Sequence, residues 1–250
     1  MRVSVETCVA RHIGDRKDQQ DRVAVLTHPS HPGALLVALA DGMGGRNGGG
    51  AAADQVVVAA HRSLEAFTPA TDQPEQVLDA AIRSAHGAIR MSQFTGEQDP
   101  HSTVAMYILY RGKAYWAHCG DSRVYHFRDR QLLARTRDHS LVGELQRRGK
   151  LSEEEALRHP QRNVLAACLG GDRPPRIEHG ECGDVALGDR FLLCTDGLWH
   201  YFGDSELAAT LADFPAVEAA RRLLGLARQR AGDHGDNIAF AIIGFVAVKG

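Results

Sequence analysis

The sequence of 250 residues lacks several features that would mark particular classes of protein. Its longest apolar runs, 34–40 and 238–248, are shorter than the ~18 to 20 residues that span a bilayer. It has only five cysteines, which are widely spread and form no C-x-x-C pair. The sequence therefore predicts no membrane anchor, no thiolate zinc site and no disulfide framework, and it favours a reducing compartment.

An excess of positive charge is also missing. The formal net charge is −2 and the pI is near 6.7, so the strongly basic face that nucleic-acid binding requires is not expected. Only four of the 29 Lys and Arg residues are lysines, a bias that is typical of GC-rich bacterial genomes. Charged residues interrupt residues 1–17 where a cleaved secretion signal needs an apolar stretch, so we expect a cytoplasmic protein.

No low-complexity linker or internal repeat divides the chain, and we expect a single domain over residues 1–250. Short segments rich in β-branched and aromatic residues predict strands, and longer segments rich in Ala, Leu and Arg predict helices. Short turns between consecutive strands indicate antiparallel pairing and an α+β fold. The predicted strands are 34–40, 103–110, 114–119, 123–127 and 191–194, and the predicted helices are 51–67, 74–91, 205–211 and 217–231.

The pattern changes over residues 139–168. Ser152 and Glu155 have the spacing of a capping box, which begins a helix. The sequence thus predicts a helical insertion between two strand regions. Its Arg147, Arg148 and Arg158 either contact acidic or phosphorylated peptides or form solvated helix faces.

Acidic residues stand where several apolar segments end or begin. Asp41, Asp121 and Asp196 follow predicted strands in turn sequences, and Asp236 precedes the apolar segment 238–248. A strand delivers such a side chain to the edge of its sheet, where acids from several strands can converge. Carboxylates, backbone carbonyls and water are the ligands of hard cations such as Mg²⁺ and Mn²⁺.

A single Asp-Gly pair after a strand is most often a hairpin turn. However, the segment D41-G-M-G-G-R-N-G-G-G contains more glycine than one turn requires. It has no Lys for a G-x-x-x-x-G-K-[ST] loop, and Asn47 replaces the last Gly of G-x-G-x-x-G, so a nucleotide-binding loop is not indicated. The repetition of acids at strand ends favours a metal centre.

Six short motifs in order along the chain resemble the PPM (type 2C) family of metal-dependent protein serine/threonine phosphatases. They are D41-G-M-G-G, S102-T-V-A105, G120-D-S-R123, D138-H-S-L141, L193-C-T-D-G197 and D236-N237. The resemblance implies a four-layer α-β-β-α sandwich of two packed antiparallel sheets. It assigns two metal ions to Asp41, the Gly42 carbonyl, Asp196 and Asp236, and a third, weaker ion to Asp121.

The resemblance also implies an activity, the hydrolysis of phosphoserine and phosphothreonine in proteins by a water that two Mn²⁺ or Mg²⁺ ions activate. Arg16 matches the family arginine that grips the phosphate, and Asp21 matches an acid that acts through metal-bound water. The insertion 139–168 corresponds to the family's mobile flap. The expected partners are phosphorylated proteins and a cognate serine/threonine kinase, with no nucleic acid and no membrane, and the chain is expected to be a monomer.

The chain departs from the family pattern at a few positions. Gln19 and Gln20 replace the usual Asn and Glu, so one carboxylate that supports the second metal is missing. Met43 stands where some relatives carry a proposed proton-donating His. Two alternatives remain: a pseudophosphatase that binds without turnover, against which the retained acids argue, and a calcium-binding module, for which the ordered acid ladder is absent.

Overall fold

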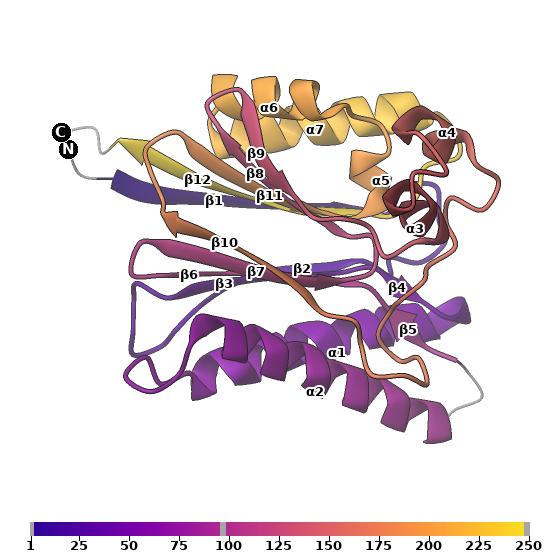
Figure 1. Cartoon of the computed structure of the whole chain (residues 1–250), viewed down its shortest axis with the longest axis horizontal. Coiled ribbons are helices and arrows are strands. Elements are labelled where there is room, and N and C mark those ends of the chain that lie inside the picture. Colours follow the sequence, from indigo (N-terminus) through magenta and orange to yellow (C-terminus); the bar gives the residue numbers. More distant parts are fainter. Residues whose placement is uncertain (1–2, 96–98, 248–250) are drawn as a thin grey trace.

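The computed structural model describes residues 3–95 and 99–247. Two five-stranded sheets pack face to face, and a pair of long helices covers the outer face of each (Figure 1). Every pairing between the described strands is antiparallel. The expected α+β fold, a four-layer α-β-β-α sandwich, is confirmed.

The first sheet has the strand order β1-β12-β11-β8-β9, and the second has the order β10-β7-β6-β3-β2. The strands of the first sheet are β1 (Val3–His12), β12 (Ile238–Ala247), β11 (Asp189–Cys194), β8 (Arg123–Arg128) and β9 (Gln131–Arg135). Those of the second are β10 (Glu178–Asp184), β7 (Lys113–Cys119), β6 (Val104–Tyr110), β3 (Leu35–Ala40) and β2 (Arg22–Thr27). The short strands β4 (Gly42–Met43) and β5 (His101–Ser102) form a separate pair.

Three apolar cores separate the four layers. Helices α1 (Gly45–Ala66) and α2 (Pro74–Thr95) bury their apolar faces against the second sheet, around Leu36 and Ile108. Helices α6 (Asp204–Asp213) and α7 (Ala216–Ala231) do the same against the first sheet. Alternate residues of the central strands, among them Tyr107 and Phe191, fill the space between the sheets. Burial of this apolar surface is the main force that holds the layers together.

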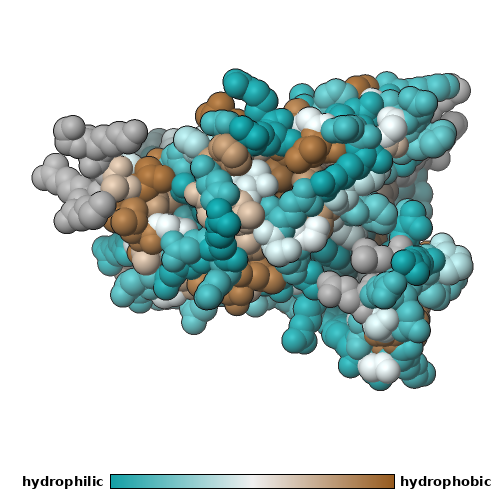
Figure 2. Space-filling view, turned by 90° about the horizontal axis from the view of Figure 1, so that it is seen from above, coloured by the Kyte–Doolittle hydropathy of each residue, from teal (hydrophilic) through white to brown (hydrophobic). Residues whose placement is uncertain are grey.

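The outer surface of the helical layer on the first sheet is mostly hydrophilic, with small apolar patches between polar side chains (Figure 2). Among the described residues, no helix combines the length and the hydrophobicity that crossing a membrane requires.

The insertion predicted at 139–168 lies between β9 and β10. It contains α3 (Leu141–Arg147) and α4 (Glu153–Arg158), and α4 begins with the expected capping box of Ser152 and Glu155. Backbone hydrogen bonds close its neck: Leu141 donates to the Val164 carbonyl, and Ala166 donates to the His139 carbonyl. The insertion, which we call the flap, lies at the same end of the sandwich as β4, β5 and α5 (Asp196–Trp199), away from the termini (Figure 1).

The glycine-rich segment after Asp41 forms β4 and then the start of α1, which begins at Gly45 and not near residue 51 as predicted. The glycines permit a close backbone approach. A Cβ on Gly42 would lie 1.9 Å from the Gly49 carbonyl oxygen, and one on Gly49 would lie 2.6 Å from Gln20 Oε1. Only glycine allows the helix to pack this tightly against β4 and the Gln20 loop.

Candidate metal centre

A cavity of about 400 Å³ opens at the flap end of the sandwich. Four aspartates that the sequence places at different strand ends line it together: Asp41, Asp121, Asp196 and Asp236. The other lining residues are Arg16, Lys17, Asp18, Gln20, Gly42, Met43, Asn163, Leu165 and Asn237. The fold therefore brings together six of the seven residues singled out as ligands or catalytic groups, including the proposed phosphate clamp Arg16.

Asp41 is positioned by the motif S102-T103. The Asp41 amide donates to Thr103 Oγ1 at 3.0 Å, while its carbonyl accepts from the Thr103 amide at 2.9 Å and from Ser102 Oγ at 3.1 Å. Thr103 Oγ1 also shares a hydrogen bond of 2.7 Å with Ser122 Oγ. This network ties the backbone of Asp41 to the turn that carries Asp121.

Asp236 lies in the loop between α7 and β12, and this loop contacts the loop before β2. Asn237 accepts from the Gln20 amide at 2.6 Å and donates to the Ile13 carbonyl at 2.7 Å. Arg16 Nη2 donates to Asp236 Oδ2 at 2.6 Å. The side chain of Arg16 is 60% exposed, so the guanidinium lies at the rim of the cavity with one carboxylate as its partner.

Asp21 does not line the cavity and lies behind it, with only 1% of its surface exposed. Thr195 Oγ1 donates to Asp21 Oδ2 at 2.8 Å and is fixed in turn by hydrogen bonds with Ala239. Asp21 is placed to support the lining acids and not to touch a ligand directly. Sequence reasoning missed Thr195, although it immediately precedes Asp196 in the motif L193-C-T-D-G197.

The acids of the centre are crowded and poorly compensated. Burial, followed by the charges of Asp21 and Asp196, raises the pKa of Asp41 well above its usual range. Burial and Asp196 do the same for the pKa of Asp121. Burial and Asp236 raise the pKa of Asp196 to about 6, and burial raises that of Asp21 to about 8. An external cation would relieve this repulsion, and an all-oxygen donor set fits Mg²⁺ or Mn²⁺.

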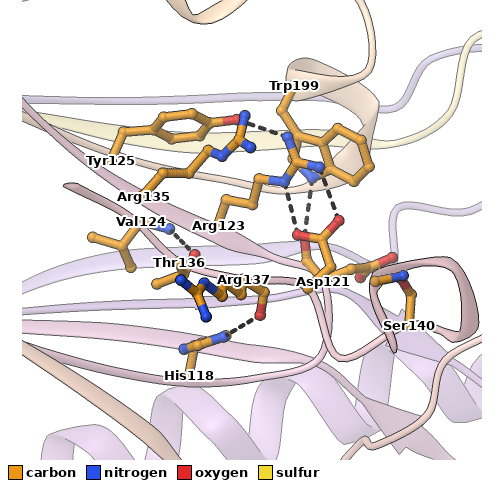
Figure 3. A network of polar contacts seen from close by, with 12 residues as sticks. His118, Asp121, Arg123, Val124, Tyr125, Arg135, Thr136, Arg137, Ser140 and Trp199 are labelled. Carbon is orange, nitrogen blue, oxygen red and sulfur yellow. Dashed lines mark hydrogen bonds and ion pairs between the residues drawn. The ribbon is translucent and has the colours of Figure 1, made fainter. Parts of the chain in front are cut away.

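The backbone of Asp121 is fixed by Trp199 of α5, whose Nε1 donates to the Asp121 carbonyl at 3.0 Å. Arg123 lies 3.5 Å from the centre of a Trp199 ring (Figure 3). It binds Asp138 through two hydrogen bonds of 2.8 Å. Trp199 does not line the cavity but packs behind it, against Arg123 and the turn of Asp121. The motifs G120-D-S-R123 and D138-H-S-L141 meet in this contact.

The flap contributes Asn163 and Leu165 to the cavity wall, two residues to which sequence analysis gave no role. The flap arginines are elsewhere: Arg147 pairs with Glu144, and Arg158 pairs with Glu154 at 3.0 Å. His101 does not line the cavity, and its Nδ1 lies 2.9 Å from the Asp99 carbonyl oxygen.

Comparisons with known proteins agree with this geometry. The model of the family described as "Protein phosphatase 2C" matches residues 9–229. The serine/threonine protein phosphatase PstP of Mycobacterium tuberculosis is 35% identical over 215 residues, which are 85% of this chain and 40% of that protein. The chain therefore spans less than half the length of that relative. A putative protein phosphatase 2C-type of Streptococcus pyogenes is 30% identical over 97% of both chains.

Solved structures show the same architecture. The serine/threonine phosphatase of S. agalactiae superposes with a TM-score of 0.84 at 28% identity, covering 98% of this chain and 100% of that one. The catalytic domain of PstP, solved in complex with two manganese ions, gives a TM-score of 0.81 at 27% identity over 98% and 100% of the chains. The chain belongs to the protein phosphatase 2C family.

Proposed function

We propose that the protein hydrolyses phosphoserine and phosphothreonine in proteins with the help of two Mn²⁺ or Mg²⁺ ions. Asp41, the Gly42 carbonyl, Asp196 and Asp236 would hold the two ions, and Asp121 would hold a third, weaker one. The observation that carries the proposal is the convergence of these crowded carboxylates in one cavity of a protein phosphatase 2C family member. The relative with two manganese ions supports the choice of metal.

Divalent cations in such a centre lower the pKa of a water molecule and neutralise phosphoryl oxygens. The chain itself supplies the position and the charge of the ligands. S102-T103 fixes the backbone of Asp41, and Thr195 orients the buried Asp21 behind it. The cavity is open to solvent at the rim where Arg16 lies, so a phosphorylated side chain of a protein can reach the acids from that side.

Arg16 would bind the phosphate, because its planar guanidinium can contact two oxygens at once. Arg16 pairs with Asp236, and metal binding to Asp236 would release the guanidinium for substrate. We expect Arg16→Ala to raise KM roughly 10- to 100-fold, as for the loss of a charged hydrogen bond, without weakening Mn²⁺ binding. Steady-state kinetics combined with manganese titration tests this. Lost manganese affinity at an unchanged KM would show that the residue serves the metal.

The remaining features of the proposal come from the sequence and from the family resemblance. We propose one phosphatase domain over residues 1–250, a monomeric and cytoplasmic protein, and a role opposite a serine/threonine kinase. Similarity to bacterial protein phosphatases, such as PhpP of Streptococcus pneumoniae at 28% identity over 97% of both chains, supports a phosphorylated protein as the substrate.

The decisive experiment is the hydrolysis of a phosphothreonine peptide by the purified protein in chelator and in Mn²⁺. Release of phosphate that requires the metal and disappears in Asp236→Asn is the expected result. Tight binding of the peptide by wild-type protein without phosphate release would instead identify a pseudophosphatase.

A further inference from the structure

A second group of potential metal ligands lies at the neck of the flap, outside the acidic cavity. His118 belongs to β7, His139 is the first residue of the flap, and Glu178 is the first residue of β10. None of the three lines the acidic cavity. Their potential ligand atoms all lie within 4.8 Å of one another.

The two imidazoles are buried and each has one ring nitrogen without a hydrogen-bond partner. His118 and His139 are 2% and 0% exposed, and their rings stack with centroids 4.5 Å apart. His118 Nε2 donates to the Arg137 carbonyl at 2.9 Å (Figure 3), which leaves the Nδ1 lone pair buried and unpartnered. His139 Nδ1 accepts from the Gly120 amide at 3.3 Å, and its Nε2 makes no hydrogen bond.

A buried nitrogen without a hydrogen bond is costly, so His118 Nδ1 points to a missing partner, and His139 Nε2 has only a contact with Glu178 nearby. His139 Nε2 lies 3.3 Å from Glu178 Oε1. Two ligands that are each about 2.0–2.1 Å from a tetrahedral zinc ion lie roughly 3.3 Å apart, so this pair already has a suitable spacing. The bond from His118 Nε2 to a backbone carbonyl is the usual outer contact of a metal-bound imidazole.

Two arginines compete with an ion for Glu178. Arg176 binds Glu178 directly, and Arg147 lies 3.9 Å from it. Both arginines also pair with Glu144, Arg176 at 2.6 Å. Glu144 can therefore retain the two guanidinium groups when Glu178 Oε1 exchanges Arg176 for an ion, and the exchange leaves neither arginine without a carboxylate partner.

We propose that His118, His139 and Glu178 form a binding site for one Zn²⁺ ion, distinct from the acidic centre. Imidazole nitrogens favour Zn²⁺ over Mg²⁺, while the all-oxygen acidic cavity favours hard cations. The two sites would thus select different metals. A water molecule would complete the tetrahedron, as in other sites with three protein ligands.

The ion would join three segments that frame the flap. The His139 amide donates to the Gly120 carbonyl at 2.9 Å, and the His139 carbonyl accepts from Ala166 at 2.7 Å at the far side of the neck. Ligation through His139 Nε2 moves the ring proton to Nδ1, so the Gly120 amide loses its acceptor and faces a second donor. Zinc would tie the three segments together and at the same time shift the backbone next to Asp121.

The test uses Co²⁺ as a spectroscopic substitute for Zn²⁺, because tetrahedral cobalt with imidazole ligands absorbs visible light far more strongly than octahedral cobalt with oxygen ligands. The full chain, freed of metal and then saturated with Mg²⁺, is titrated with Co²⁺. We expect one strong absorbing site that Zn²⁺ abolishes by displacement. His118→Gln and Glu178→Gln should weaken this site at least about tenfold.

Two control variants separate the two metal sites. His179→Gln alters a neighbouring histidine that is partly exposed and bound to Asp79, and it should leave the cobalt spectrum unchanged. Asp236→Asn should lose phosphatase activity but keep the strong absorption. Absence of that absorption in wild-type protein would refute the zinc site whether or not the variants fold, as would its persistence in folded Glu178→Gln or its loss in Asp236→Asn. Manganese-dependent hydrolysis, measured separately, reports on the proposed function.

Discussion

Two regions of the molecule hold aspartates in different degrees of burial and treat their charge in opposite ways. Asp189, at the start of β11, is 0% exposed. Arg128 donates to it at 2.7 and 2.9 Å, the Ala186 amide at 2.7 Å, and His126 Nε2 lies 3.0 Å away. Burial would raise its pKa, but these partners outweigh burial and lower it.

In the acidic centre burial prevails, and the neighbouring acids add to it. The pKa values of Asp41 and Asp121 are raised well above the usual range. A carboxylate that has its own cation and hydrogen bonds is part of the fold, whereas carboxylates that repel one another lower the stability of the metal-free protein. This difference in charge compensation distinguishes aspartates that stabilise the fold from aspartates that serve a ligand.

Replacing Asp41 should have the largest effect on activity. We expect Asp41→Asn to lower kcat on the order of 10³-fold, because it removes an anionic ligand between two proposed cations. The same change relieves repulsion, so the melting temperature in chelator should rise. Phosphate-release assays and thermal unfolding of the wild-type and Asp41→Asn proteins measure kcat and the melting temperature. Full turnover by this variant in chelator would refute the two-metal centre.

Replacing Asp189 should have the opposite pattern. Asp189→Asn leaves Arg128 and His126 without their anion, and we expect a loss of roughly 2–4 kcal/mol in the free energy of unfolding. Manganese-dependent activity well below the melting temperature should stay near that of wild type. Denaturant unfolding and phosphatase assays at low temperature measure the two effects. Loss of activity in a fully folded variant would contradict the structural role.

The metal-free protein should also become less stable as pH rises. The folded-state pKa of Asp21 is about 8, above the ~3.9 of an unfolded chain, so the proton it holds stabilises the fold at low pH. Stability is lost as pH rises through 8, by roughly 2 kcal/mol between about pH 6.5 and 8.5. In chelator the melting temperature should fall by roughly 5 °C over this range. Asp21→Asn should reduce this fall in melting temperature. An equal dependence of melting temperature on pH in the wild-type and variant proteins would contradict the assignment of the effect to Asp21.

The sequence predicted the central layers of the fold because their segments are strongly apolar. All five predicted strands and four predicted helices are present, within a few residues at most boundaries. The strands at the edges of the two sheets, β1, β2, β9 and β10, were missed, because their residues are exposed or half-buried and their composition is mixed. The start of α1 was misplaced because glycine ordinarily disfavours helices, and tertiary packing against Gly42 overrides that preference here.

The convergence of Asp41, Asp121, Asp196 and Asp236 was predictable from their places at strand ends and from the family motifs. Their roles as metal ligands stay predictions. The pairing of Arg16 with Asp236 was not predictable, since 220 positions separate the two residues. The buried contact between Thr195 and Asp21 likewise depends on how β2 and β11 meet across the sheets.

Gln20 sharpens the comparison between compensated and uncompensated acids, because it is a neutral residue in a wall of carboxylates. Its backbone amide is bound by Asn237, and its Oε1 lies close to Gly49. Relatives that carry Glu at this position would neutralise two cations more fully. We expect Gln20→Glu to tighten Mn²⁺ binding at one of two sites, by roughly five- to tenfold, because a carboxylate near a cation in a low-dielectric cavity attracts it strongly.

The alternative is that the amide oxygen of Gln20 serves the hydrated metal as well as a carboxylate would. Calorimetric titration with Mn²⁺ distinguishes the two, and indistinguishable affinities at both sites would reject the argument from charge. Gln19→Glu is a matched control, because Gln19 bonds with the His12 carbonyl and the Asp21 amide and does not line the cavity. The added carboxylate also has a cost without metal: Gln20→Glu should lower the melting temperature in chelator, whereas Asp41→Asn should raise it. Only a centre whose carboxylates repel one another until cations bind predicts both the lower melting temperature of Gln20→Glu and the higher melting temperature of Asp41→Asn.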